Sequence, residues 1–200
     1  MLHALVFHPL RRLYDWVLSL AQHPHAGLAL FLVAFAESSF FPIPPDVLLI
    51  ALALGLPQRA WRLALIATVG SVLGGIVGYG IGWGLMASVG QWILDVYGLH
   101  EQFERIRDWY LRYDLWAVLI AGFTPIPYKV FTIAAGAFDM DLWRFTGASV
   151  VGRGGRFFLV AGLIFYYGAP IKSFIDRYFN LLTVLFAVLL VGFFLVLGLL

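Results

Sequence analysis

The sequence Phe-Pro-Ile-Pro-Pro-Asp at residues 41–46 and the sequence Thr-Pro-Ile-Pro-Tyr-Lys at residues 124–129 interrupt two apolar segments in nearly the same way. Proline removes a backbone donor and clashes with the preceding helical turn, so each motif ends one helix before another begins. The arms of the first segment, residues 26–41 and 47–56, are shorter than the roughly 20 residues that a membrane-spanning helix needs. We therefore predict paired half-helices, an arrangement typical of transporter binding sites. The predicted hinge residues are Pro42, Pro44, Pro45, Pro125 and Pro127.

The composition is that of an integral membrane protein. Of the 200 residues, 62% are hydrophobic and only 12% are charged, which is far from the balance of a soluble domain. The formal net charge is +2, and no stretch combines clustered basic residues with stacking aromatics, which argues against a nucleic-acid partner. Because the chain has no cysteine, disulfides and thiolate sites are excluded.

Apolar and charged segments alternate along the chain in two similar halves. Each half contains an amphipathic segment, a broken hairpin and a glycine-bearing helix long enough to span a bilayer. The predicted units are an N-terminal amphipathic segment (1–25), a transporter domain (26–180) with hairpins at 26–57 and 115–138, spanning helices at 63–89 and 145–169, an amphipathic helix or helical pair at 91–114, and a C-terminal transmembrane helix (181–200).

The predicted fold is an all-α integral membrane protein with an inverted repeat of a re-entrant hairpin and a transmembrane helix. In this arrangement one side of the membrane carries six basic residues and the other side carries four. The excess of basic residues predicts a cytoplasmic N-terminus. The six are Arg11, Arg12, Arg59, Arg62, Lys172 and Arg177, and the four are Arg105, Arg107, Arg112 and Arg144.

Two carboxylates flank the first hinge, Glu37 before it and Asp46 after it. Acidic groups at membrane depth usually face a protein interior or an aqueous cavity, where they relay protons or contact substrate. Burial and a like-charged neighbour raise the pKa of a carboxyl group, so we predict proton coupling or substrate gating at these positions. Two structural alternatives stay open, because Asp46 can cap the following helix and Glu37 can form a permanent salt bridge.

Two arginines, Arg153 and Arg156, lie three residues apart within the second long apolar run. This spacing places both on roughly one face of a helix, and the guanidinium fork suits a phosphate or a carboxylate. We predict that they pair with Glu37 and Asp46 and bind an anionic head group when a carboxylate becomes protonated. A permanent structural ion pair is the alternative. Lys129 in the second hinge either extends this basic surface or extends to the membrane interface.

The remaining polar residues suggest no catalytic chemistry. The five histidines fall in presumed surface segments without metal-ligand spacing, so we predict no metal and no cofactor. Ser38 and Ser39 lack a neighbouring histidine base, and hydrogen bonding at a helix end explains them more simply. We predict that the protein is not an enzyme.

The segment from Phe35 to Asp46 resembles the F-x-E…P-x-P-x-[DE] signature of the DedA family of membrane proteins, also called VTT-domain or SNARE-associated proteins. The Gly-Arg-Gly-Gly-Arg-Phe-Phe stretch at 152–158 further resembles its YqaA-like branch. The resemblance implies a bacterial inner-membrane protein with two re-entrant hairpins that moves undecaprenyl phosphate or phospholipids between leaflets. It also implies dependence on the proton motive force and assigns acidic roles to Glu37 and Asp46.

The second hinge departs from the family pattern. Many DedA members carry R-x-x-P-x-x-R there, whereas this chain has Gly122 and Tyr128 at the two arginine positions. We infer that Arg153 and Arg156 replace that charge from the following helix.

The function predicted from these features is a proton-linked flippase or scramblase for a phosphate-bearing lipid, with protons and the anionic lipid as partners and with oligomerisation permitted by the glycine-rich helix. A proton- or ion-coupled antiporter of a small solute uses the same carboxylates without opening sideways to lipid. A non-transporting membrane scaffold predicts instead that neutralising Glu37 and Asp46 has no effect in folded protein.

Overall fold

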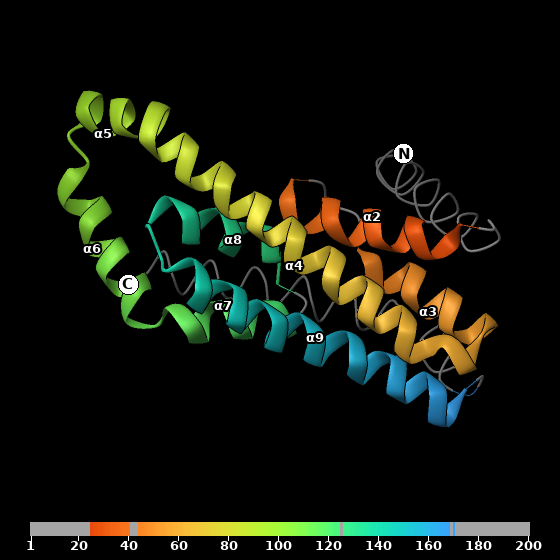
Figure 1. The fold of residues 1–200 in the computed structure, drawn as a ribbon. Helices are drawn as coiled ribbons and strands as arrows, with labels where there is room; N and C mark the ends of the chain where they lie inside the picture. Colours follow the sequence, from red (N-terminus) through yellow and green to blue (C-terminus); the bar gives the residue numbers. More distant parts are fainter. Residues whose placement is uncertain (1–24, 41–43, 125, 169, 171–200) are drawn as a thin grey trace, which may run out of the picture.

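The computed structural model describes residues 25–40, 44–124, 126–168 and 170, and this part of the chain is helical without strands. Figure 1 shows the arrangement of the helices. The elements are α2 (Ala26–Ser39), α3 (Pro45–Gly55), η1 (Pro57–Arg59), α4 (Ala60–Leu85), η2 (Met86–Gly90), α5 (Gln91–Tyr97), α6 (His100–Arg112), α7 (Asp114–Phe123), α8 (Tyr128–Ala137) and α9 (Leu142–Tyr167). The predicted segments at 1–25 and 181–200 lie outside the described residues, apart from residue 25.

Both apolar segments are broken where the prolines predict. Helix α2 ends at Ser39 and α3 begins at Pro45, with Pro44 as its N-cap residue. Helix α7 ends at Phe123, and Pro127 is the N-cap residue of α8. The second arms begin two residues earlier than predicted, because proline is well accommodated at the start of a helix. The hinge residues Pro42 and Pro125 lie outside the described residues.

Two helices of the described chain are long and apolar enough to cross a membrane. The first begins three residues before the predicted position 63 and continues past the end of α4. The π-helical turn η2 joins α4 to α5, so the helical run covers Pro57–Tyr97. The second is α9, which begins three residues before and ends two residues before the predicted boundaries. The two long runs were therefore correctly predicted, whereas the π turn was not.

Glycines of α4 bring this helix against the backbone of α2. A Cβ atom at Gly70 would lie 2.5 Å from the carbonyl oxygen of Phe31, and one at Gly74 would overlap the carbonyl oxygen of Phe35. These contacts advance in the same direction along both helices, so α2 and α4 run parallel. Small residues at four-residue spacing allow such close approach between helices in lipid.

The same stripe of α4 continues onto the second hairpin. A Cβ atom at Gly82 would overlap the carbonyl oxygen of Ile133, and one at Gly136 would overlap that of Tyr79. Helix α4 therefore packs against its own first arm, α2, and against the second arm of the other half, α8.

Helix α9 repeats this arrangement. A Cβ atom at Gly152 would lie 2.8 Å from the carbonyl oxygen of Leu119 in α7, and α9 also packs against α3. Trp61 near the start of α4 stacks with Phe158, in the second half of α9, and Tyr79 contacts Phe145, near its start. The two long helices are therefore antiparallel, and each one contacts both hairpins.

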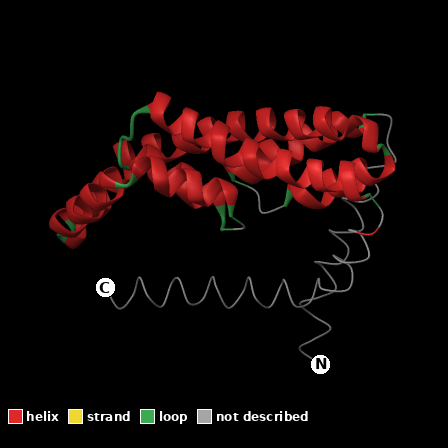
Figure 2. Ribbon diagram, turned by 90° about the horizontal axis from the view of Figure 1, so that it is seen from below, coloured by secondary structure: helices red, strands yellow, loops and turns green. Residues whose placement is uncertain are grey.

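The predicted amphipathic pair at 91–114 corresponds to α5 and α6, which lie at one end of the bundle (Figures 1 and 2). Gly98 adopts a φ of +63° in the turn between them, a conformation that glycine adopts without strain. A hydrogen bond joins α6 to α8 of the second hairpin: Tyr110 Oη donates to the carbonyl of Phe131 at 3.1 Å. Burial, reinforced by the neighbouring Tyr128 and Asp114, raises the pKa of Tyr110, so its hydroxyl remains a donor at neutral pH.

Asp114 at the start of α7 also contacts α9 at this end of the bundle, through Arg144. Its buried carboxylate forms an ion pair with Arg144 at 3.0 Å and accepts hydrogen bonds from Arg144 at 3.1 Å and from the backbone N–H of Leu115 at 2.6 Å. We expect Asp114→Asn to lower the free energy of unfolding by about 1–2 kcal/mol, because it weakens charge-assisted hydrogen bonds to a buried group. Thermal unfolding in detergent measures this loss, with Glu101→Gln in the exposed pair with Arg105 as the control. Equal stabilities of the two variants would contradict the prediction.

Candidate functional site

The inner ion pair joins α9 to α2. The Arg153 guanidinium lies 2.7 Å from Glu37 Oε2, and Arg153 Nε donates a 2.6 Å hydrogen bond to Ser71 Oγ in α4. The side chain of Arg153 is 3% exposed and that of Glu37 is 15% exposed. Three helices that are distant in sequence therefore meet at one buried guanidinium.

The outer ion pair joins α9 to both hinges. Arg156 binds Asp46 through two parallel hydrogen bonds, Nε to Oδ1 at 3.0 Å and an Nη to Oδ2 at 2.9 Å. Its other Nη donates to the backbone carbonyl of Thr124 at 2.6 Å. Asp46 lies at the start of α3 and Thr124 follows α7. The side chains of Arg156 and Asp46 are 20% and 16% exposed, so this pair is more accessible than the inner guanidinium.

Hydroxyl groups and aromatic rings complete the surroundings of Arg153. Ser71 Oγ hydrogen-bonds to Ser38 Oγ at 2.7 Å, and Ser38 Oγ also donates to Glu37 Oε2 at 3.2 Å. The guanidinium carbon lies 5.0 Å from the ring centroid of Tyr128 and 4.7 Å from that of Phe157. Both rings are within the range of a cation–π interaction.

The structure contains the pairing that the sequence suggested between Glu37, Asp46 and the two arginines. Each carboxylate binds its own arginine. Asp46 makes no capping hydrogen bond to α3, whose N-cap residue is Pro44, and its carboxylate is bound to Arg156. It does lie in the first turn of α3, where a negative charge complements the helix dipole.

Lys129 does not join this cluster. Its side chain is half-buried and, within the described chain, makes no ion pair or hydrogen bond; its backbone carbonyl accepts a hydrogen bond from Thr132. Pro44 precedes and Pro45 begins α3, which carries Asp46, and Pro127 precedes α8, which carries Tyr128.

Sequence reasoning missed four contributors to the site: Ser38, Ser71, Tyr128 and Phe157. One signal was present for Ser71. Gly70 of α4 packs against α2, and Gly152 of α9 packs against α7, so the two glycines hold equivalent positions in the two halves. Ser71 and Arg153 are the residues that follow them. The residues that follow these glycines meet where the two long helices cross.

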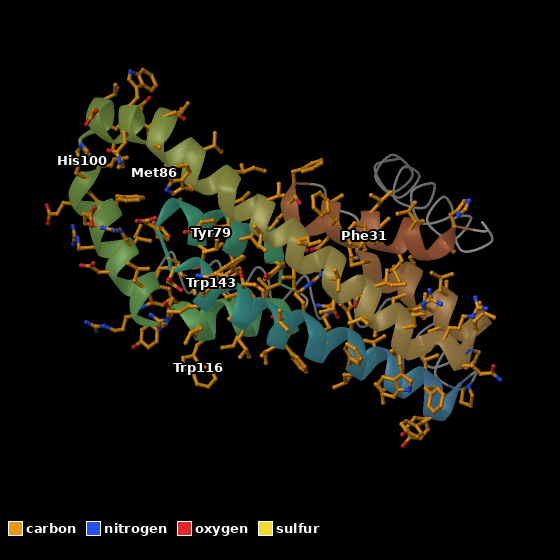
Figure 3. All side chains as sticks on the ribbon, viewed as in Figure 1. Phe31, Tyr79, Met86, His100, Trp116 and Trp143 are labelled. Carbon is orange, nitrogen blue, oxygen red and sulfur yellow. The ribbon has the colours of Figure 1, made fainter. Side chains whose placement is uncertain are left out.

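Exposed aromatic side chains lie near both ends of the long helices. Trp61 and Trp83 of α4 are separated by about 33 Å at a rise of roughly 1.5 Å per residue, and Trp143 and Tyr166 of α9 by about 35 Å. Trp116 is exposed and points away from the bundle (Figure 3). Arg153 lies about 15 Å along α9 from Trp143 and about 20 Å from Tyr166. The charged cluster is therefore close to midway between the aromatic ends.

The charged groups gathered at this site are two arginines and two carboxylates. Within the described ranges no group of three histidine, aspartate or glutamate side chains could hold a metal ion. The two guanidinium groups are each held by one carboxylate, and the guanidinium fork suits a carboxylate or a phosphate.

The described part of the chain is helical, and two of its helices, long and apolar enough to cross a membrane, pack around two largely enclosed charge pairs. The VTT domain family matches residues 43–166, and the chain belongs to this family, which is also known as DedA.

Curated relatives come from distant organisms. An uncharacterised protein of Haemophilus influenzae is 38% identical over 78% of this chain and 81% of its own length. An uncharacterised protein of Methanocaldococcus jannaschii is 31% identical over 62% of this chain and 74% of its own length. A Staphylococcus aureus protein named undecaprenyl phosphate transporter A is 28% identical over 63% of this chain and 66% of its own length. No solved structure matches the chain.

The two positions at which the family resemblance expects arginine both border Arg153. A Cβ atom at Gly122 would lie 3.3 Å from the backbone nitrogen of Arg153, and the ring of Tyr128 packs against its guanidinium. The guanidinium of Arg153, on α9, therefore lies beside Gly122 of α7 and Tyr128 of α8, the two positions at which the family pattern has arginine.

Proposed function

We propose that the protein moves a phosphate-bearing lipid between the two leaflets of a membrane, as a flippase or scramblase linked to the proton motive force. The observation that carries this proposal is the partly buried cluster of Arg153, Arg156, Glu37 and Asp46 at the point where both hinges meet the long helices. Four ionised groups far from either aromatic end are costly in a membrane protein and indicate function.

In this proposal the bilayer occupies the space between the aromatic ends, because tryptophan and tyrosine favour the membrane interface. The charged cluster then lies near the midplane. Helix α2 runs parallel to α4, α7 runs parallel to α9, and the two long helices are antiparallel. These directions support two re-entrant hairpins that enter from opposite sides, as expected for inverted repeats.

Exchange of charge partners provides the transport step. The carboxylates of Glu37 and Asp46 hold the arginines while no substrate is bound, and protonation weakens their hold. The freed positive charge then attracts the phosphate, while the hydrocarbon tails stay in the bilayer. Lys129 adds positive charge at the edge of the second hinge. No covalent step is needed, and the host membrane is the bacterial inner membrane with the N-terminus in the cytoplasm.

The name of the Staphylococcus aureus relative supports a polyprenyl phosphate as the first lipid to test. A phospholipid is the second lipid, because it offers the same phosphate on different tails.

Transbilayer movement of labelled undecaprenyl phosphate and a labelled phospholipid in proteoliposomes tests the proposal. We expect wild-type protein to move at least one of them, a pH gradient to change the rate, and Glu37→Gln to reduce movement at least tenfold. The matched control is Arg105→Ala, which removes an arginine from an exposed ion pair on α6. If folded wild-type protein moves neither lipid, the proposal fails, and a small-solute antiporter or a scaffold becomes the better account.

A further inference from the structure

We infer that the two ion pairs have different tasks, and that the phosphate group contacts Arg156 directly while Arg153 is a fixed positioning residue. This inference rests on the proposed function and refines it. It follows from three differences between the two arginines: their hydrogen-bond partners, their contacts with aromatic rings and the exposure of their side chains.

Arg153 has little freedom to exchange partners. Its Nε is bound to Ser71 and one Nη is bound to Glu37, while the rings of Tyr128 and Phe157 lie against the guanidinium. Tyr128 is itself held by a hydrogen bond to Ser149. Only 3% of the Arg153 side chain is exposed, so an incoming phosphate would have to displace aromatic side chains before reaching it.

Arg156 is placed to exchange partners. One-fifth of its side chain is exposed, and its hydrogen-bond partners among the described residues, Asp46 and the backbone of Thr124, belong to the hinge regions rather than to a long helix. The Asp46 carboxylate presents two oxygens to the guanidinium fork, which is the geometry that a phosphate also offers. Asp46 is therefore a built-in competitor for the phosphate.

Replacement of Asp46 by the phosphate at Arg156 also connects substrate binding to a change in how the two hairpins are held. Arg156 is tied at the same time to Asp46 in the first hairpin and to the backbone of Thr124 in the second. A phosphate that takes the place of Asp46 releases the first hairpin tip. Arg153 meanwhile keeps α9 attached to α2 and α4 and supplies positive potential without direct contact.

Competition predicts an unusual result for Asp46→Asn. Removing the carboxylate leaves Arg156 with a weaker neutral partner, so the phosphate should bind about tenfold more tightly, a change of about 1.4 kcal/mol in binding free energy. Glu37→Gln should not tighten binding, because Arg153 is not the contact residue.

Arginine modification by phenylglyoxal, located by mass spectrometry of the full-length protein in vesicles, tests the inference. The vesicles contain polyprenyl phosphate, the matched polyprenol without phosphate, or phosphatidylglycerol, and a fourth sample receives inorganic phosphate. We expect modification of Arg156 but not Arg153, protection of Arg156 by a phosphate-bearing lipid but not by polyprenol, and half-protection at about tenfold less lipid in Asp46→Asn. Protection by inorganic phosphate alone would identify a free anion as the ligand and overturn the lipid assignment.

The wild-type comparison does not depend on any variant folding correctly. Modification and protection at Arg153, or at both arginines equally, would overturn the inference. If the same preparation transports lipid while Arg156 is never protected, the inference fails and the proposed function stands. If no lipid is transported and none protects either arginine, both fail.

Discussion

Replacing Arg153 with alanine is expected to lower the free energy of unfolding by about 3–5 kcal/mol and to abolish lipid movement. The substitution leaves the carboxylate of Glu37 without its cationic partner in a largely buried position, and breaking such a pair costs far more than the pair contributes. It also removes the hydrogen bond to Ser71 and the contacts with two aromatic rings.

Thermal and denaturant unfolding of the purified protein in detergent measure this effect. The double variant Glu37→Gln with Arg153→Met should recover most of the lost stability, because it removes both charges and not one. Arg105→Ala on the surface should change stability by less than about 1 kcal/mol. If Arg153→Ala behaves like Arg105→Ala, the inner pair does not hold the three helices together.

Substitution of Gly74 by alanine is expected to cost about 2–3 kcal/mol, the upper part of the range for overpacking a close contact. The added methyl group would overlap the backbone carbonyl of Phe35, which cannot turn aside as a flexible side chain can. Gly82→Ala should behave alike, because its Cβ would overlap the carbonyl of Ile133.

The same helix supplies the control for this prediction. Gly80 has nothing within 4 Å of the position of its Cβ, so Gly80→Ala should leave stability unchanged or raise it by up to about 1 kcal/mol through helix propensity. Melting temperatures and the monodisperse fraction in detergent compare the variants. Equal behaviour of Gly74→Ala and Gly80→Ala would show that α2 and α4 do not pack through their glycines.

Local features of the sequence predicted the helices well. The prolines set where the half-helices end, because the loss of a donor acts on the chain immediately around it. The length and polarity of the runs at 63–89 and 145–169 predicted the two long helices to within a few residues at their starts. The three-residue spacing of Arg153 and Arg156 placed both on a face that meets acidic side chains.

The parts that failed depend on tertiary contacts. A glycine stripe predicts close packing but does not say that α8 covers half of it, and Ser71 belongs to the site only because α9 crosses α4 at that level. Tyr128 and Lys129 are adjacent in the second hinge, but successive helical residues point about 100° apart. Tyr128 packs against Arg153, whereas the Lys129 side chain makes no ion pair or hydrogen bond in the described chain. Which of two adjacent hinge residues contacts Arg153 depends on the rotation of α8, and the sequence alone does not give this rotation.

Each long helix packs against an arm of the other half, α4 against α8 and α9 against α3, and this affects biosynthesis. Helix α4 leaves the ribosome well before α8, the arm that covers Gly82, and α3 leaves before α9. During this interval the first half is a membrane intermediate with an uncovered glycine surface and an unpaired Glu37. It is therefore the species most exposed to membrane proteases and to capture by insertion chaperones, and truncation after α4 should yield a product that the cell degrades.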